Sequence, residues 1–151
     1  MTGAASRAPS PAGPNPIALK LGYAGLIPFV LGAALVWLVH PEVLHHVAYP
    51  LAGYAALVLS FLGGIHWGLA MRQSVPSPRL YAWGVMPSLV AWVGVVMPPY
   101  AGLVVLGAML VVCYAVDRRV YPRQGAGAWL VLRFRLTAVG SLSCFLAAAG
   151  T

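Results

Sequence analysis

The sequence predicts an all-α integral membrane protein, an irregular bundle of five transmembrane helices with its N terminus in the cytoplasm and its C terminus outside. Three observations predict this class. The 151 residues are 61% hydrophobic and only 7% charged, whereas a soluble domain carries about a quarter charged residues. Five apolar stretches have lengths near the roughly 20 residues that cross a bilayer as a helix. All nine Lys and Arg residues fall on one side of the resulting topology.

The five apolar stretches are residues 19–39, 51–71, 80–97, 100–116 and 129–149. The third and fourth are short and are separated only by Met97-Pro98-Pro99-Tyr100, so a re-entrant hairpin is the competing interpretation. Two full spans are preferred because each stretch is close to the length that crosses about 30 Å of hydrocarbon. Pro28 and Pro87 each remove a helical hydrogen bond and predict kinks in the first and third spans.

Residues 1–16, MTGAASRAPSPAGPNP, are rich in Pro, Ala, Ser and Gly and are expected to be a disordered tail. Residues 17–151 are expected to form one transmembrane domain. The first apolar stretch starts late and is too long for a secretory signal peptide, and a mitochondrial presequence would contain more Arg. The expected location is the bacterial inner membrane.

The orientation follows from the basic residues, because cytoplasmic loops carry an excess of Lys and Arg. The two loops on the other side of the membrane, residues 40–50 and the turn at residues 98–99, contain no Lys or Arg. The net charge of +7 is spread over membrane-flanking segments, so the bilayer is the expected partner and nucleic acid is not. The basic residues are Arg7 and Lys20 before the first loop, Arg72 and Arg79 after the second span, and Arg118, Arg119, Arg123, Arg133 and Arg135 after the fourth.

The second stretch contains SFLGGIHWGLAMR, residues 60–72. Ser60, Gly64 and Gly68 recur once per helical turn and predict a groove where another helix packs closely. Gly63 lies on a different face, the face that also carries His66.

His66 is six residues from Arg72, which places it about 9 Å inside the cytoplasmic interface at 1.5 Å per residue. An imidazole at that depth needs a partner. One interpretation is a neutral histidine that hydrogen-bonds the next helix and fixes packing. The alternative is a site that relays a proton, hydrogen-bonds a quinone, or ligates haem or another metal.

Asp117 is the only acid on the cytoplasmic side. Its position near the end of the fourth span is unfavourable for the helix dipole, so we expect it to pair with an Arg. Arg133 and Arg135 are two residues apart and therefore point to different sides. One is expected to reach the headgroups while the other turns inward, which would join His66, Asp117 and an Arg in one polar cluster.

Two other groups of polar residues are weighed as sites. Thr137 and Ser141 form a polar stripe on the fifth span, where hydroxyl groups commonly bond back to the helix at a packing seam. His40, Glu42, His45 and His46 suit Zn or Cu by residue type. However, the adjacent His45 and His46 would diverge on a helix, and solvated interfacial histidines are the preferred interpretation.

The segments GYAGLIPF, SFLGGIHWGLA and MPSLVAWV, and a late DRR followed by LRFRLT, resemble the bacterial membrane family called domain of unknown function 3429. That family is similar to a mitochondrial inner-membrane group, transmembrane protein 69. The resemblance covers roughly residues 19–148. It implies a multi-pass fold in an inner membrane and brings no established activity.

Two classes of function follow. The first is a non-enzymatic accessory or assembly subunit, which associates through its helices with other inner-membrane proteins or with itself as a homo-oligomer. The alternative is a small quinone-, haem- or ion-handling protein centred on His66. No cofactor is required by the sequence, and an enzyme with its own covalent chemistry ranks last because no nucleophile–base pair is present.

Overall fold

The computed structural model describes residues 13–75 and 77–151. The expected disorder of the tail concerns mainly residues 1–12, which lie outside the described residues. Short 3₁₀ turns at Pro41–Val43, Pro122–Gln124 and Gly127–Trp129 precede or follow the α-helices. The α-helices are α1 (Pro16–Ala24), α2 (Ile27–Leu38), α3 (His45–Met71), α4 (Pro78–Val96), α5 (Pro99–Val120) and α6 (Leu130–Gly150).

Among the described residues, five helical segments are long and apolar enough to cross a membrane, with α1 and α2 together forming the first. The predicted five-span, all-α class is therefore confirmed. The third and fourth spans are two full helices, α4 and α5, of 19 and 22 residues, and not a re-entrant hairpin.

Two predicted boundaries are wrong. The helix α3 begins at His45 and contains Pro50, whereas residues 40–50 were expected to be a loop. Proline removes only its own N–H, and at a membrane surface water can bond the carbonyl that is left free. The helix α5 continues to Val120, four residues beyond the predicted end, so Asp117 lies on the helix.

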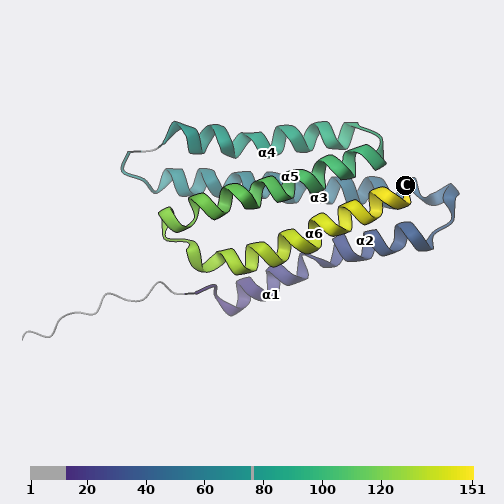
Figure 1. Cartoon of the computed structure of the whole chain (residues 1–151), viewed down its shortest axis with the longest axis horizontal. Helices are drawn as coiled ribbons and strands as arrows, with labels where there is room; N and C mark the ends of the chain where they lie inside the picture. The colour runs from purple at the N-terminus through teal and green to yellow at the C-terminus, as the bar shows by residue number, and fades with distance from the viewer. Residues whose placement is uncertain (1–12, 76) are drawn as a thin grey trace, which may run out of the picture.

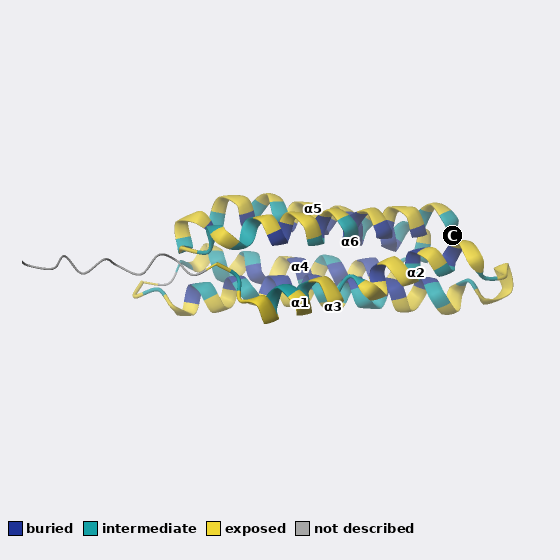
Figure 2. Cartoon of the chain, turned by 90° about the horizontal axis from the view of Figure 1, so that it is seen from below, coloured by how far each residue is buried: buried dark blue, intermediate teal, exposed yellow. Residues whose placement is uncertain are grey.

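The helices run back and forth along the long axis of the molecule (Figure 1). The α3–α4 and α5–α6 connections lie at one end with the start of α1, and the α2–α3 and α4–α5 connections lie at the other end with the C terminus. In Figure 2, α5 and α6 lie above α3, α4 and the α1–α2 pair, and the buried residues face inward between these two layers. The helix α3 packs against α2, α4, α5 and α6.

Glycine brings α3 and α4 into close contact. A Cβ atom on Gly63 would collide with the carbonyl oxygen of Gly84. By contrast, a Cβ atom on Gly64 or Gly68 would meet nothing within 4 Å, and Ser60 is also exposed. The groove expected at Ser60, Gly64 and Gly68 therefore holds no helix from the described part of the chain. The packing glycine is the one that shares a face with His66.

The first span is broken between α1 and α2 at Gly25 and Leu26, just before the kink expected at Pro28. Pro28 lies in the first turn of α2, where its missing N–H breaks no helical hydrogen bond. The Gly25 carbonyl accepts a 2.8 Å hydrogen bond from the Tyr54 hydroxyl. None of the α1 residues is buried, and Pro87 lies inside an unbroken α4.

The close contact predicts that Gly63→Ala and Gly64→Ala differ in effect although the two glycines are adjacent. Gly63→Ala forces α3 and α4 apart and should destabilise the protein by about 1–3 kcal/mol, as overpacked cores do. Gly64→Ala should stabilise it by up to about 1 kcal/mol, because alanine favours the helix and has room. Circular dichroism during unfolding in detergent measures both, and equal effects would contradict the packing described here.

Candidate functional site

Three polar side chains from three helices meet inside the bundle. His66 on α3 and Asp117 on α5 are each 1% exposed, and Arg133 on α6 is 7% exposed. The structure thus brings together the three residues that the sequence places at one depth. The cluster lies toward the end of the bundle that carries the α5–α6 connection.

Arg133 binds Asp117 through two hydrogen bonds. Its Nε and Nη2 atoms donate to the same carboxylate oxygen, Oδ2, at 2.8 Å and 2.6 Å. The other carboxylate oxygen, Oδ1, lies 3.3 Å from His66 Nε2. Asp117 is therefore held between a guanidinium group on one side and an imidazole ring on the other.

His66 is enclosed on all sides by its neighbours. Its Nδ1 lies 3.2 Å from the carbonyl oxygen of Leu62, one turn earlier on α3. The rings of Trp83 and Tyr121 have centroids 6.4 Å and 6.3 Å from the imidazole. Since one ring nitrogen faces a carbonyl and the other faces Asp117, neither is directed at open space, and a haem iron does not fit at this ring.

The pairing of Asp117 follows from electrostatics. A carboxylate inside a membrane bundle is costly without an opposite charge, and the C-terminal part of α5 adds an unfavourable dipole. Arg118 and Arg119 follow it directly in the chain but are exposed. The charge is instead compensated by Arg133, which α6 brings to it from across the bundle.

Arg135 lies on the outside of the same helix. Its Nη1 donates a 3.0 Å hydrogen bond to the Tyr23 hydroxyl on α1, at an exposed position. The two arginines of α6 therefore point to different sides, and Arg135 does not belong to the buried cluster.

Tyr121 follows α5 directly and closes the cluster from one end. The pKa of its hydroxyl is raised to about 12, because burial and the negative charge of Asp117 raise it by more than Arg133 lowers it. Its phenol is 4% exposed and stays protonated throughout the physiological range.

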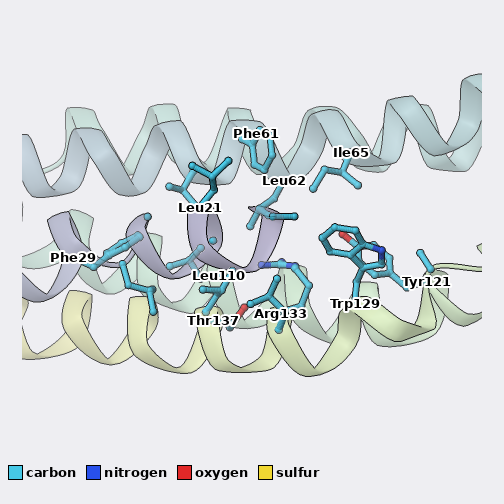
Figure 3. Close-up of a pocket in the computed structure, with 18 of the residues that line it drawn as sticks. Leu21, Phe29, Phe61, Leu62, Ile65, Leu110, Tyr121, Trp129, Arg133 and Thr137 are labelled. Atoms are coloured by element: carbon cyan, nitrogen blue, oxygen red, sulfur yellow. The ribbon is translucent and has the colours of Figure 1, made fainter. Parts of the chain in front are cut away.

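A groove of about 710 Å³ reaches the cluster from the side of α1. Leucine, phenylalanine and other apolar residues form most of its wall, and Arg133 and Thr137 project into it from α6 (Figure 3). The break at Gly25 lies in the wall of the groove, next to Leu21 and Gly22 of α1, and sequence reasoning missed the groove. The GLIP segment at the break was the one available signal.

The polar stripe of α6 lies on the same side. Ser141 Oγ donates a 2.7 Å hydrogen bond to the Thr137 carbonyl, as expected for a hydroxyl at a packing seam. Thr137 Oγ1 is buried and has no hydrogen-bond partner among the described residues.

The outer histidines do not belong to a group of three or more possible metal ligands in the described residues. In the described ranges 13–75 and 77–151, no three His, Cys, Asp or Glu residues are grouped so that they can hold a metal ion. The His45 and His46 rings lie 3.9 Å apart, so their expected divergence is wrong. They occupy the first turn of α3, where the chain leaves the 3₁₀ turn and both rings remain exposed beside one another.

Comparison with known proteins agrees with the membrane fold. A family model described as "Protein of unknown function (DUF3429)" matches residues 14–149. Transmembrane protein 69 of Xenopus tropicalis is 36% identical over 113 residues, which cover 67% of this chain and 42% of that relative. The chain therefore spans less than half the length of this curated relative. No solved structure matches.

The buried pair predicts that the two arginines of α6 respond differently to loss of charge. Arg133→Gln leaves the Asp117 carboxylate unpaired and should cost about 3–5 kcal/mol of stability. Arg135→Gln, the matched control, removes an exposed charge and should leave the unfolding midpoint near the wild-type value. The double variant Asp117→Asn, Arg133→Gln should be more stable than Arg133→Gln alone when unfolding is followed in detergent. Additive losses would contradict a coupled pair.

Proposed function

The chain belongs to the DUF3429 family of multi-pass membrane proteins, and we propose that it binds an amphiphile of the membrane in the groove between α1, α3 and α6. The observation that carries this proposal is Arg133, a charged and largely buried residue on the wall of a mostly apolar groove. Charged residues inside a membrane bundle are rare, and those that line a cavity commonly mark a substrate or ion site.

The guanidinium of Arg133 has hydrogen bonds left to give. It carries five N–H donors, and Asp117 accepts two of them. The Tyr121 hydroxyl is a further hydrogen-bond partner of the guanidinium, which leaves two N–H donors. The neighbouring Thr137 hydroxyl is buried and has no partner within the described chain. A ligand head that accepts hydrogen bonds would satisfy both groups.

The size and composition of the groove fit the rest of such a ligand. Small-molecule sites have volumes of about 300–1,000 Å³ and are mostly apolar with a few polar groups, and this groove has about 710 Å³. The carbonyl of a quinone and the head oxygens of an acyl lipid share the required acceptor chemistry. His66 does not line the groove, so its part is to position Asp117 and through it Arg133.

A second candidate function is association with another membrane protein or with a second copy of the chain. It is favoured by the exposed face of α3 that contains Ser60, Gly64 and Gly68, where an added Cβ atom at either glycine meets nothing. Small residues on a lipid-facing helix let another helix approach closely. An accessory or assembly role would use this face and leave the groove free.

We place the protein in the bacterial inner membrane with its N terminus in the cytoplasm. The support is the positive-inside rule: the α3–α4 and α5–α6 connections carry basic residues and the opposite connections carry none.

Binding predicts that an obstruction in the groove weakens ligand affinity while a neighbouring change does not. Ala18 lines the groove, and Ala18→Phe should weaken binding by about tenfold or more, which corresponds to about 1.4 kcal/mol. The adjacent exposed Ile17→Phe is the control. Binding is read in phosphatidylcholine nanodiscs from the quenching of Trp129, a lining residue, with Trp129→Phe as the background.

The probes distinguish the two ligand sources. A short-chain ubiquinone and a brominated fatty acid are titrated separately, and the tighter ligand identifies the class. If each probe quenches Trp129 with the same affinity in Ala18→Phe as in Ile17→Phe, the groove is not a binding site.

The orientation predicts which side of the membrane reacts with an impermeant maleimide. In bacterial spheroplasts, Glu42→Cys should be labelled from outside and Ser74→Cys only after lysis. The native Cys113 and Cys144 are buried and give little background. Labelling of Ser74→Cys in intact spheroplasts would reverse the proposed topology.

A further inference from the structure

The contact between His66 and Asp117 forms no hydrogen bond. A carbonyl oxygen can only accept, so a hydrogen bond at the 3.2 Å contact with Leu62 requires the hydrogen on His66 Nδ1. In a neutral ring Nε2 then carries a lone pair, and it faces Asp117 Oδ1 at 3.3 Å. Both atoms are sealed from solvent and neither has a hydrogen-bond partner among the described residues.

From this geometry we infer that the groove ligand is an acidic amphiphile with a carboxylate or phosphate head, and that its binding is coupled to the uptake of one proton between His66 Nε2 and Asp117 Oδ1. The inference rests on the proposed function and names its ligand class and its regulation. The proton comes from a hydronium ion or a buffer acid in the bulk solvent: one bond from that donor to hydrogen breaks, and one N–H or O–H bond forms at the pair.

The coupling follows from the charge of the buried cluster. Asp117 and Arg133 together carry no net charge. A proton between His66 and Asp117 makes the cluster +1, and a bound monoanion without that proton makes it −1. Only the ligand and the proton together return the cluster to zero, which a low-dielectric interior favours. Each must therefore increase the affinity for the other.

None of the other groups around His66 is suited to accept this proton. Trp83 from α4 is a donor only. The Tyr121 hydroxyl after α5 keeps its own proton, since its pKa is raised to about 12. Arg133 from α6 is always charged, and Cys113 lies one turn before Asp117 on α5. Asp117 is the one acidic residue that pairs with the ring in the described chain, and its Oδ1 lies 3.3 Å from Nε2.

A second positive charge lies at the end of the groove. Arg72 lines the groove and also an adjoining hollow of about 150 Å³, together with Gln73 and Gln124. The polar lining of the site thus offers cations and amides, with no acid that lines either space. This charge distribution complements an anionic head and gives a neutral head no advantage.

The test uses a head whose charge does not change with pH. Dodecanesulfonate is titrated into the full-length protein in phosphatidylcholine nanodiscs, and dodecanol is the neutral match. Calorimetry in two buffers of different ionisation enthalpy should give an uptake of about one proton per sulfonate and none for dodecanol. At pH values where the empty site holds no extra proton, the affinity for sulfonate should fall about tenfold for each unit by which the pH rises.

One variant assigns the proton. His66→Gln offers an uncharged amide donor and should bind sulfonate with no proton uptake. His46→Gln, which removes an exposed histidine at the other end of α3, should behave like wild type. The wild-type comparison between buffers holds even if His66→Gln does not fold.

The outcomes separate the two proposals. Binding of sulfonate without proton uptake, while dodecanol or a quinone also binds, would overturn the inference and leave the proposed function intact. No binding of any amphiphile would overturn both. Displacement of sulfonate by oleate or by phosphatidate would support the inference and show which head the site takes, and displacement by neither would overturn the assignment of a carboxylate or phosphate.

Discussion

The burial of one carboxylate governs the arrangement of this bundle. Asp117 is 1% exposed in a chain with only two acidic residues, and an unpaired charge at this position would be strongly unfavourable. Arg133 must therefore reach it across the α5–α6 seam, and this fixes the register of the two helices. His66 touches the same carboxylate from α3, so three helices are tied at one point.

The break in the first span determines what this cluster can do. Gly25 and Leu26 interrupt the helix, and Tyr54 bonds the Gly25 carbonyl at the break. Gly22, Gly25 and Leu26 all line the groove that Arg133 reaches from α6, so the break and the binding surface lie together. The same interruption costs little because Pro28 needs no hydrogen-bond acceptor in the first turn of α2.

Much of this was predictable from the sequence, for definite reasons. Span length and charge asymmetry are set by the bilayer, so the five spans follow from composition. The inward turn of one α6 arginine followed from the two-residue spacing of Arg133 and Arg135, although that spacing does not say which of the two turns inward. The groove was not predictable, because it depends on how α1, α3 and α6 are placed relative to one another in three dimensions. The packing role of Gly63, and not of Gly64, depends on the position of α4 around α3, which periodicity does not specify.

The chemistry of the cluster is poorly suited to stability alone. Buried ion pairs are often no more stabilising than apolar residues of similar volume, and a structural pair gains most when every donor and acceptor is satisfied. Here Arg133 retains donors on the groove side, Thr137 Oγ1 has no partner in the described chain, and Nε2 and Oδ1 face each other unbonded. The groove side of the cluster thus has unused hydrogen-bond donors, and the far side has two buried atoms, Nε2 and Oδ1, that form no hydrogen bond with each other. A ligand that accepts hydrogen bonds in front and a proton that binds behind would satisfy both sides at once.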